Sequence, residues 1–170
     1  MDAIQDRIPE FEIGLGMMKV SHKPSVLCIS GIGSCVGLAM RDDVTLASGL
    51  AHILLPASKE TKEGVANPGK YSDTAVPALV DGLVAHGAIV GHIMAKLVGG
   101  GRVLENGFDG MQNVECARSA LGRRGIGISA EDVGGAYGRS MRFDTASGNI
   151  QVRRFRQYKG ISELKDTITI

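Results

Sequence analysis

Cys35 and His52 are the residues of this sequence whose chemical types and surroundings suit covalent catalysis. Cys35 ends a glycine-rich run, 30–35, which predicts a tight turn with exposed backbone N–H groups. His52 lies in the apolar run 49–56, which we expect to form the next strand. A thiol, an imidazole that takes its proton and oxyanion donors around Gly33 are the parts needed for acyl transfer through a thioester. The alternative is a buried cysteine beside a strand histidine that is bonded to a backbone carbonyl.

Other chemistries fit the sequence less well. The segment 64–70 matches the start of a phosphate-binding loop, but Tyr71 stands where that motif needs Ser or Thr, and the preceding residues are charged rather than strand-like. The histidines are scattered, without the spacing that puts two metal ligands on one helical face. Cys28 is expected to be a buried strand residue, and Cys116 has no activating motif near it. The sequence therefore predicts neither a metal nor a cofactor.

Composition narrows the class of protein. A chain of 170 residues is expected to form one domain with its own core, with residues 1–9 as a polar lead-in and 156–170 as a C-terminal extension. The formal net charge of +1 argues against a nucleic-acid binder, and no apolar run reaches the length of a membrane span. Three cysteines without a CxxC pair, and an N-terminus without a signal sequence, favour the reducing cytoplasm.

Short strands must position the two residues. Apolar runs bounded by Gly, Pro or charged turns predict strands at 11–20, 26–29, 36–40, 46–55, 93–98, 126–133, 140–144 and 149–155, the last two as a hairpin. Helical spacing of apolar residues predicts helices at about 72–87 and 111–124, and residues 57–70 are expected to be an exposed loop. Because strands and helices do not alternate regularly, we predict an α+β fold with mixed or antiparallel sheets and two helices packed on one side.

Several segments together resemble the CheD family, the chemoreceptor glutamine deamidases of chemotaxis. They occur in the family's order across roughly residues 25–155. The glycine–serine–cysteine turn, combined with the downstream strand that contains a histidine, is a specific signature. The matching segments are 31–36, 51–56, 70–76, 96–100, 113–114, 131–135 and 139–140, followed by the hairpin that ends at Gly148.

The resemblance implies hydrolysis of glutamine side chains on methyl-accepting chemoreceptors to glutamate during chemotactic adaptation. It implies an amidohydrolase of the cysteine-hydrolase type, in which Cys35 is the nucleophile and His52 is the acid and base. The fold is expected to resemble the cysteine deamidase domain of cytotoxic necrotising factor toxins. The CheC phosphatase, a partner of this family, is expected to bind the protein as well, and no cofactor, nucleic acid or membrane insertion is expected.

One position departs from the family's pattern. The family places a threonine six residues before the cysteine, and this sequence has Ile29, whose side chain cannot form a hydrogen bond. The group that orients His52 is therefore open. Ser30 is expected to point to the opposite face of its strand, Ser34 could contribute, and a backbone carbonyl is the interpretation that we favour. If Ile29 prevents catalysis, the alternative function is a non-catalytic or weakly catalytic regulatory partner of the CheC phosphatase.

Basic residues gather on and beside the predicted C-terminal hairpin. Asp144 is the only acid between positions 139 and 159, so this segment forms a basic surface in a nearly neutral chain. The pattern predicts either electrostatic steering of an acidic partner or a solvated strand edge whose charges deter aggregation. The basic residues are Arg139, Arg142, Arg153, Arg154, Arg156 and Lys159.

Overall fold

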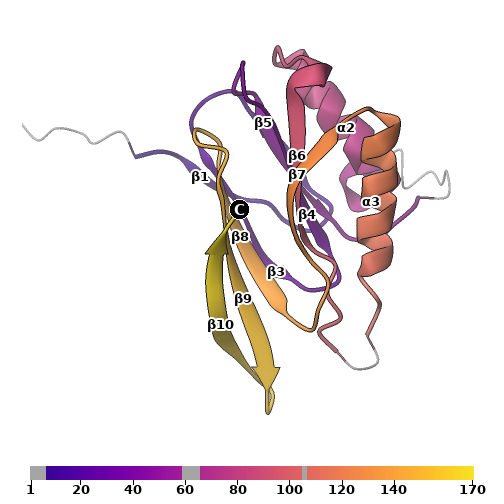
Figure 1. The fold of residues 1–170 in the computed structure, drawn as a ribbon, viewed down its shortest axis with the longest axis vertical. Coiled ribbons are helices and arrows are strands. Elements are labelled where there is room, and N and C mark those ends of the chain that lie inside the picture. Colours follow the sequence, from indigo (N-terminus) through magenta and orange to yellow (C-terminus); the bar gives the residue numbers. More distant parts are fainter. Residues whose placement is uncertain (1–6, 59–65, 105–106) are drawn as a thin grey trace, which may run out of the picture.

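The protein is built of three layers, two β-sheets and a pair of helices (Figure 1). The computed structural model describes residues 7–58, 66–104 and 107–170. In these residues two five-stranded sheets face one another, and two α-helices cover the outer face of one sheet. The predicted α+β class, with mixed sheets and two helices on one side, is confirmed.

The first sheet, sheet A, contains the C-terminal hairpin. Its order is β1-β3-β8-β9-β10, in which β1 pairs in parallel with β3 and the other neighbours are antiparallel. The predicted hairpin of residues 140–144 and 149–155 is confirmed as β8 and β9. Residues 156–170, which we expected to be an extension, form the end of β9 and all of β10, and this hairpin projects from the molecule in Figure 1. The strands are β1 (Glu10–Glu12), β3 (Val26–Ile32), β8 (Gly138–Asp144), β9 (Ile150–Tyr158) and β10 (Ile161–Thr169).

The second sheet, sheet B, contains the strands beside the candidate site. Its order is β2-β5-β4-β6-β7, antiparallel except for the β6–β7 pair. The strand expected at 11–20, with interruptions at Gly14 and Gly16, divides at these glycines into β1 of sheet A and β2 of sheet B. Gly14 and Gly16 lie between the two, and Gly16 has a φ of 71°, which interrupts an extended strand. The strands are β2 (Met18–Ser21), β5 (Ser48–Ile53), β4 (Val36–Asp42), β6 (Ile93–Gly99) and β7 (Gly127–Val133).

The helices α2 (Ser72–Ala85) and α3 (Met111–Arg123) follow β5 and β6 in the chain. Short 3-10 turns, η1 (Pro68–Lys70) and η2 (Val90–His92), precede α2 and β6. Of the loop expected at 57–70, residues 59–65 lie outside the described residues. No described helix is both long and apolar enough to cross a bilayer. Each helix buries most of the residues whose spacing predicted it, namely Ala75, Leu79 and Leu83 in α2 and Val114, Ala117 and Leu121 in α3. Val84 and Met111, which the same spacing placed on these faces, are exposed and half-buried.

Sheet B is buried on both faces because it lies between the helices and sheet A. One apolar core fills the space between sheet B and the helices. A second, the inter-sheet core, lies between the two sheets and includes Cys35. The large side chains of the inter-sheet core are Leu27, Ile29, Ile32, Leu50, Met141 and Phe143. Residues at the ends of β4 and β5 are therefore held by packing from two sides.

Candidate active site

Cys35 and His52 lie at the same end of neighbouring strands and on the same face of sheet B. β4 and β5 are antiparallel, with Gly37 opposite His52 and Val36 opposite Ile53 as the last pair. Side chains alternate along a strand, so Cys35, two residues before Gly37, shares the face of His52. Diagonal neighbours on such a face have Cα atoms about 7–8 Å apart. The structure therefore makes the two predicted residues diagonal neighbours, and no hydrogen bond joins the Cys35 thiol to the His52 Nε2.

This face of sheet B looks into the inter-sheet core. Cys35 belongs to that core and is 7% exposed. A side chain at Gly37 would collide with Met141 and would approach Ile29, both of which belong to sheet A. Ile29 therefore packs over the Gly37–His52 pair, where it presents only carbon atoms. Its side chain therefore cannot form a hydrogen bond with His52.

Three backbone groups of the segment 13–17 hold His52. The imidazole Nδ1 lies 3.1 Å from the carbonyl oxygen of Ile13, the His52 N–H donates to the Met17 carbonyl at 2.9 Å, and the His52 carbonyl accepts from the Gly16 N–H at 2.8 Å. A carbonyl only accepts, so Nδ1 carries the proton and Nε2 carries the lone pair. Burial lowers the pKa of His52, although the Ile13 carbonyl and the charge of Glu12 oppose this. The imidazole is thus neutral at pH 7, and its Nε2 has no hydrogen-bond partner among the described residues.

Burial also shifts the pKa values of the cysteine thiols. It raises the pKa of Cys35, against a smaller opposing effect from that residue's own backbone N–H. The thiol is therefore protonated at pH 7 and needs a base to become a nucleophile. Burial and the carboxylate of Glu10, to which the Cys28 thiol donates at 3.3 Å, raise the pKa of Cys28 to about 12. Burial raises the pKa of Cys116 as well. Cys35 differs from both in sharing a strand face with a neutral imidazole.

The turn before Cys35 is held by its carbonyl groups, which leaves N–H groups unused. The Gly100 N–H donates to the Cys35 carbonyl at 2.7 Å, and the Gly101 N–H donates to the Gly33 carbonyl at 2.9 Å. The N–H groups of Gly33 and Ser34 donate to no acceptor in the part of the chain that the structure describes. Two unpaired N–H groups next to a thiol form a candidate oxyanion site.

The two serines proposed from the sequence contribute less to the candidate site. Ser30 is exposed on the outer face of β3, and its backbone N–H donates to Glu12 at 2.7 Å. The hydroxyl of Ser34 has no partner among the described residues. The backbone carbonyl that we favoured as the partner of His52 is that of Ile13, a residue that sequence reasoning did not identify, and the side chain of Asn113, whose amide contacts the turn, was missed. A backbone carbonyl carries no sequence signal, whereas a polar residue on the apolar face of a helix does.

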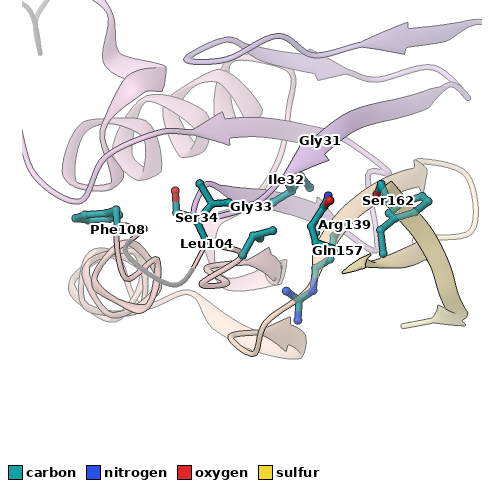
Figure 2. A pocket seen from close by; sticks show the side chains of 13 residues that line it. Gly31, Ile32, Gly33, Ser34, Leu104, Phe108, Arg139, Gln157 and Ser162 are labelled. Carbon is teal, nitrogen blue, oxygen red and sulfur yellow. The ribbon is translucent and has the colours of Figure 1, made fainter. Parts of the chain in front are cut away.

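A cavity of about 590 Å³ lies beside the turn (Figure 2). Residues 31–34 form one wall, and Leu104 and Phe108 lie next to them, in the segment between β6 and α3. Gln157 and Ser162 of the β9–β10 hairpin line the other end. Leu104 and Phe108 are 69% and 43% exposed. Such an apolar rim suits contact with a polypeptide.

Part of the basic C-terminal surface is used inside the fold. The buried carboxylate of Asp132 on β7 accepts hydrogen bonds from Arg139 on β8 and Arg154 on β9, at 2.7–3.4 Å. These bonds join sheet B to sheet A. Arg142 pairs with Glu10. The basic residues of this surface that have no ion-pair partner among the described residues are Arg153, Arg156 and Lys159. Electrostatic steering of an acidic partner by this surface is therefore limited to these three residues.

The layered fold and the thiol–imidazole pair define an α+β protein with a candidate cysteine-hydrolase site. In the described residues no three side chains of His, Cys, Asp or Glu gather as metal ligands. The family model described as CheD chemotactic sensory transduction matches residues 54–154. The chain belongs to the CheD family.

Similar proteins cover most of the chain and carry one name, probable chemoreceptor glutamine deamidase. The protein from Geobacter metallireducens is 42% identical over 151 residues, which are 85% of this chain and 93% of the relative. The protein from Oceanobacillus iheyensis is 40% identical over 86% of this chain and 92% of its own length. The protein from Symbiobacterium thermophilum is 41% identical over 82% of this chain and 89% of its own length.

Proposed function

We propose that this protein is a glutamine deamidase that hydrolyses glutamine side chains of methyl-accepting chemoreceptors to glutamate. The observation that carries the proposal is the neutral imidazole of His52, with Nδ1 bonded to a carbonyl and Nε2 unpaired, on the strand face that also holds the Cys35 thiol. Such a pair can generate a thiolate from a buried thiol. The names of the relatives supply the class of substrate.

The reaction follows from the roles of these groups. His52 Nε2 takes the Cys35 proton while the sulfur attacks the side-chain carbonyl carbon of glutamine. Negative charge develops on the carbonyl oxygen, and the N–H groups of Gly33 and Ser34 are the proposed donors to it. His52 then gives its proton to the departing nitrogen, which leaves as ammonia, and a thioester remains on Cys35. Water, deprotonated by His52, attacks the thioester and releases glutamate and the protonated thiol.

The glutamine side chain must pass the turn to reach the buried thiol. We assign the chemoreceptor segment to the cavity beside residues 31–34, because that cavity adjoins the turn and has an apolar rim formed by Leu104 and Phe108. Phe155 and Gln157 line the same cavity, and the exposed Arg153, which lies over the Phe155 ring, is on the same face of β9. Acidic residues of a chemoreceptor would be attracted to that side of the cavity.

The decisive experiment is conversion of glutamine to glutamate in chemoreceptor fragments, measured by peptide mass spectrometry. We expect the wild-type protein to convert specific glutamines, and Cys35→Ala or His52→Gln to abolish conversion while the circular dichroism spectrum is retained. Cys116→Ala is the control and should retain activity, because that thiol lies on α3, outside the inter-sheet core. Activity in Cys35→Ala would exclude this nucleophile, and an inactive, folded wild-type protein would exclude the function.

A second candidate function is regulatory binding to the CheC phosphatase with little or no catalysis. The observation that favours it is Ile29, a fully buried apolar residue at the position where the family has threonine. The carbonyl of Ile13 argues in the other direction, because it gives His52 Nδ1 an acceptor without any side chain. The same assay separates the two functions, since a folded protein that binds the phosphatase but converts no glutamine supports the second.

A further inference from the structure

Asn113 is a fully buried polar residue in the first turn of α3, and it contacts both halves of the proposed site. Its side-chain nitrogen, Nδ2, donates to the carbonyl oxygens of Ser34 and Leu54, each at 3.0 Å. Ser34 directly precedes Cys35, and Leu54 lies two residues after His52. One amide group therefore bridges the turn that holds the thiol and the strand that holds the imidazole.

The bridge lies where the pairing of β4 and β5 stops. Val36 and Ile53 are the last paired residues of these strands. Beyond that pair, the carbonyl groups of Ser34 and Leu54 point to Asn113 instead of to each other's strand. The amide thus takes the place of one more pair in the ladder, at the position where the turn and the strand would otherwise separate.

Hydrogen-bond chemistry explains why this residue is an asparagine. Both protons of the NH2 group are used by carbonyl oxygens, whereas Oδ1 is buried without a partner among the described residues. The reverse orientation would put Oδ1 against two carbonyl oxygens, so the network fixes which atom is nitrogen. A buried, unpaired acceptor is unfavourable. The two bonds donated by Nδ2 oppose that cost.

Two further contacts lie at the start of α3. Ser72, the first residue of α2, donates its hydroxyl to the Asn113 carbonyl at 3.0 Å. Gly110, just before α3, packs so closely on the turn that a Cβ added there would lie 2.7 Å from the Cα of Ser34. The start of α3 is therefore in direct contact with the residue before Cys35.

We propose that Asn113 is a positioning residue, which keeps the Cys35 thiol in register with the His52 imidazole without touching the substrate. The inference rests on the deamidase function proposed above and adds the group that aligns its nucleophile and base. A displacement of about 1 Å between reacting groups lowers turnover about 100-fold. Loss of the bridge should therefore affect kcat much more than KM.

The test is Asn113→Asp, which keeps the shape of the side chain but puts oxygen against both carbonyl oxygens. We expect kcat to fall about 100-fold with little change in KM. Without substrate, alkylation of Cys35 by iodoacetamide should slow about tenfold and lose its dependence on the ionisation of His52, because the thiolate no longer forms beside the imidazole. Peptide mass spectrometry reads Cys35 and Cys116 in one sample, so the rate at Cys116 is an internal control.

Ser72→Ala is the matched control, because it removes a hydrogen bond to the Asn113 backbone and leaves the bridging amide intact. It should keep the wild-type kcat and the wild-type alkylation rate at Cys35. Asn113→Ser, which is smaller and retains one donor, is measured in parallel and serves as the test if the aspartate variant does not fold.

The proposal is overturned if a folded Asn113 variant keeps the wild-type kcat and alkylation rate while only its unfolding midpoint falls. That result would make the amide a purely structural contact. Alkylation of Cys35 needs no chemoreceptor, so it tests the alignment of thiol and imidazole even if the wild-type protein converts no glutamine. Failure of this inference and failure of the proposed function therefore give different results.

Discussion

Replacing Ile29 with threonine introduces the hydroxyl that the resemblance to the family leads us to expect, and the structure predicts that turnover will not rise. Ile29 is fully buried and packs over Gly37, the residue paired with His52. A threonine hydroxyl at this position would find the Nδ1–H of His52 already donated to the Ile13 carbonyl, whose oxygen lies 3.1 Å from Nδ1. We expect kcat of Ile29→Thr to stay within about tenfold of the wild type, or ~1.4 kcal/mol in barrier height.

The same substitution should lower the free energy of unfolding. Loss of a methylene group from a buried isoleucine costs about 0.5–1.5 kcal/mol, as in Ile→Val changes. A buried hydroxyl without a partner adds about 1–3 kcal/mol. Ile29 is surrounded by the apolar side chains of the inter-sheet core, so we expect both contributions, a total of about 1.5–4.5 kcal/mol.

Ile29→Val is the matched control, because it removes a methylene group and adds no polar atom. Urea unfolding followed by far-UV circular dichroism gives the stability of both variants, and mass spectrometry of chemoreceptor peptides gives kcat where each is folded. A rise in kcat of more than tenfold in Ile29→Thr but not in Ile29→Val would refute the reasoning. It would mean that a hydroxyl at this position orients His52 better than the Ile13 carbonyl does.

Three further predictions concern charge. Asp132→Ala leaves two guanidinium groups without their buried carboxylate, so urea unfolding should show a loss of about 3–5 kcal/mol, and a smaller loss in the control Asp166→Ala, whose carboxylate is more exposed. Burial lowers the pKa of His52 and the base must be neutral, so kcat should fall only at pH values below 6.5; an acid limb above 6.5 contradicts this. Reversing the exposed Arg153 and Arg156 to Glu should slow association with chemoreceptor fragments at low salt in stopped-flow measurements. The effect should be much smaller at high salt, because charges farther apart than the Debye length, ~8 Å at physiological ionic strength and shorter at high salt, are screened from one another. An unchanged salt dependence would make them a solvated edge.

Local patterns in the sequence were sufficient for the elements that carry the candidate site. The apolar runs at 36–40 and 46–55 form β4 and β5, and the helical spacing at 72–87 and 111–124 marks α2 and α3. These segments are recognisable because each buries its own apolar residues in a regular pattern. The proximity of Cys35 and His52 then follows from one antiparallel pairing of adjacent strands.

Features that depend on contacts between distant segments were not predictable. β10 is mostly exposed and polar, so its sequence does not distinguish a strand from an extension. Every residue has a carbonyl, so no residue type marks Ile13 as the partner of His52. Asn113 did give a signal, a polar residue among the apolar positions of a helix. Its partners, Ser34 and Leu54, are known only once α3 is placed against sheet B.

The carbonyl of Ile13 changes what the isoleucine at position 29 implies for catalysis. The third member of a catalytic triad fixes the tautomer of the histidine by accepting the Nδ1 proton. A hydroxyl can donate as well as accept, whereas a carbonyl only accepts, so the carbonyl specifies the catalytic tautomer at least as firmly. Ile29 is therefore compatible with catalysis. The consequence is that His52 depends on the segment 13–17, which crosses from sheet A to sheet B and must fold before the imidazole is oriented.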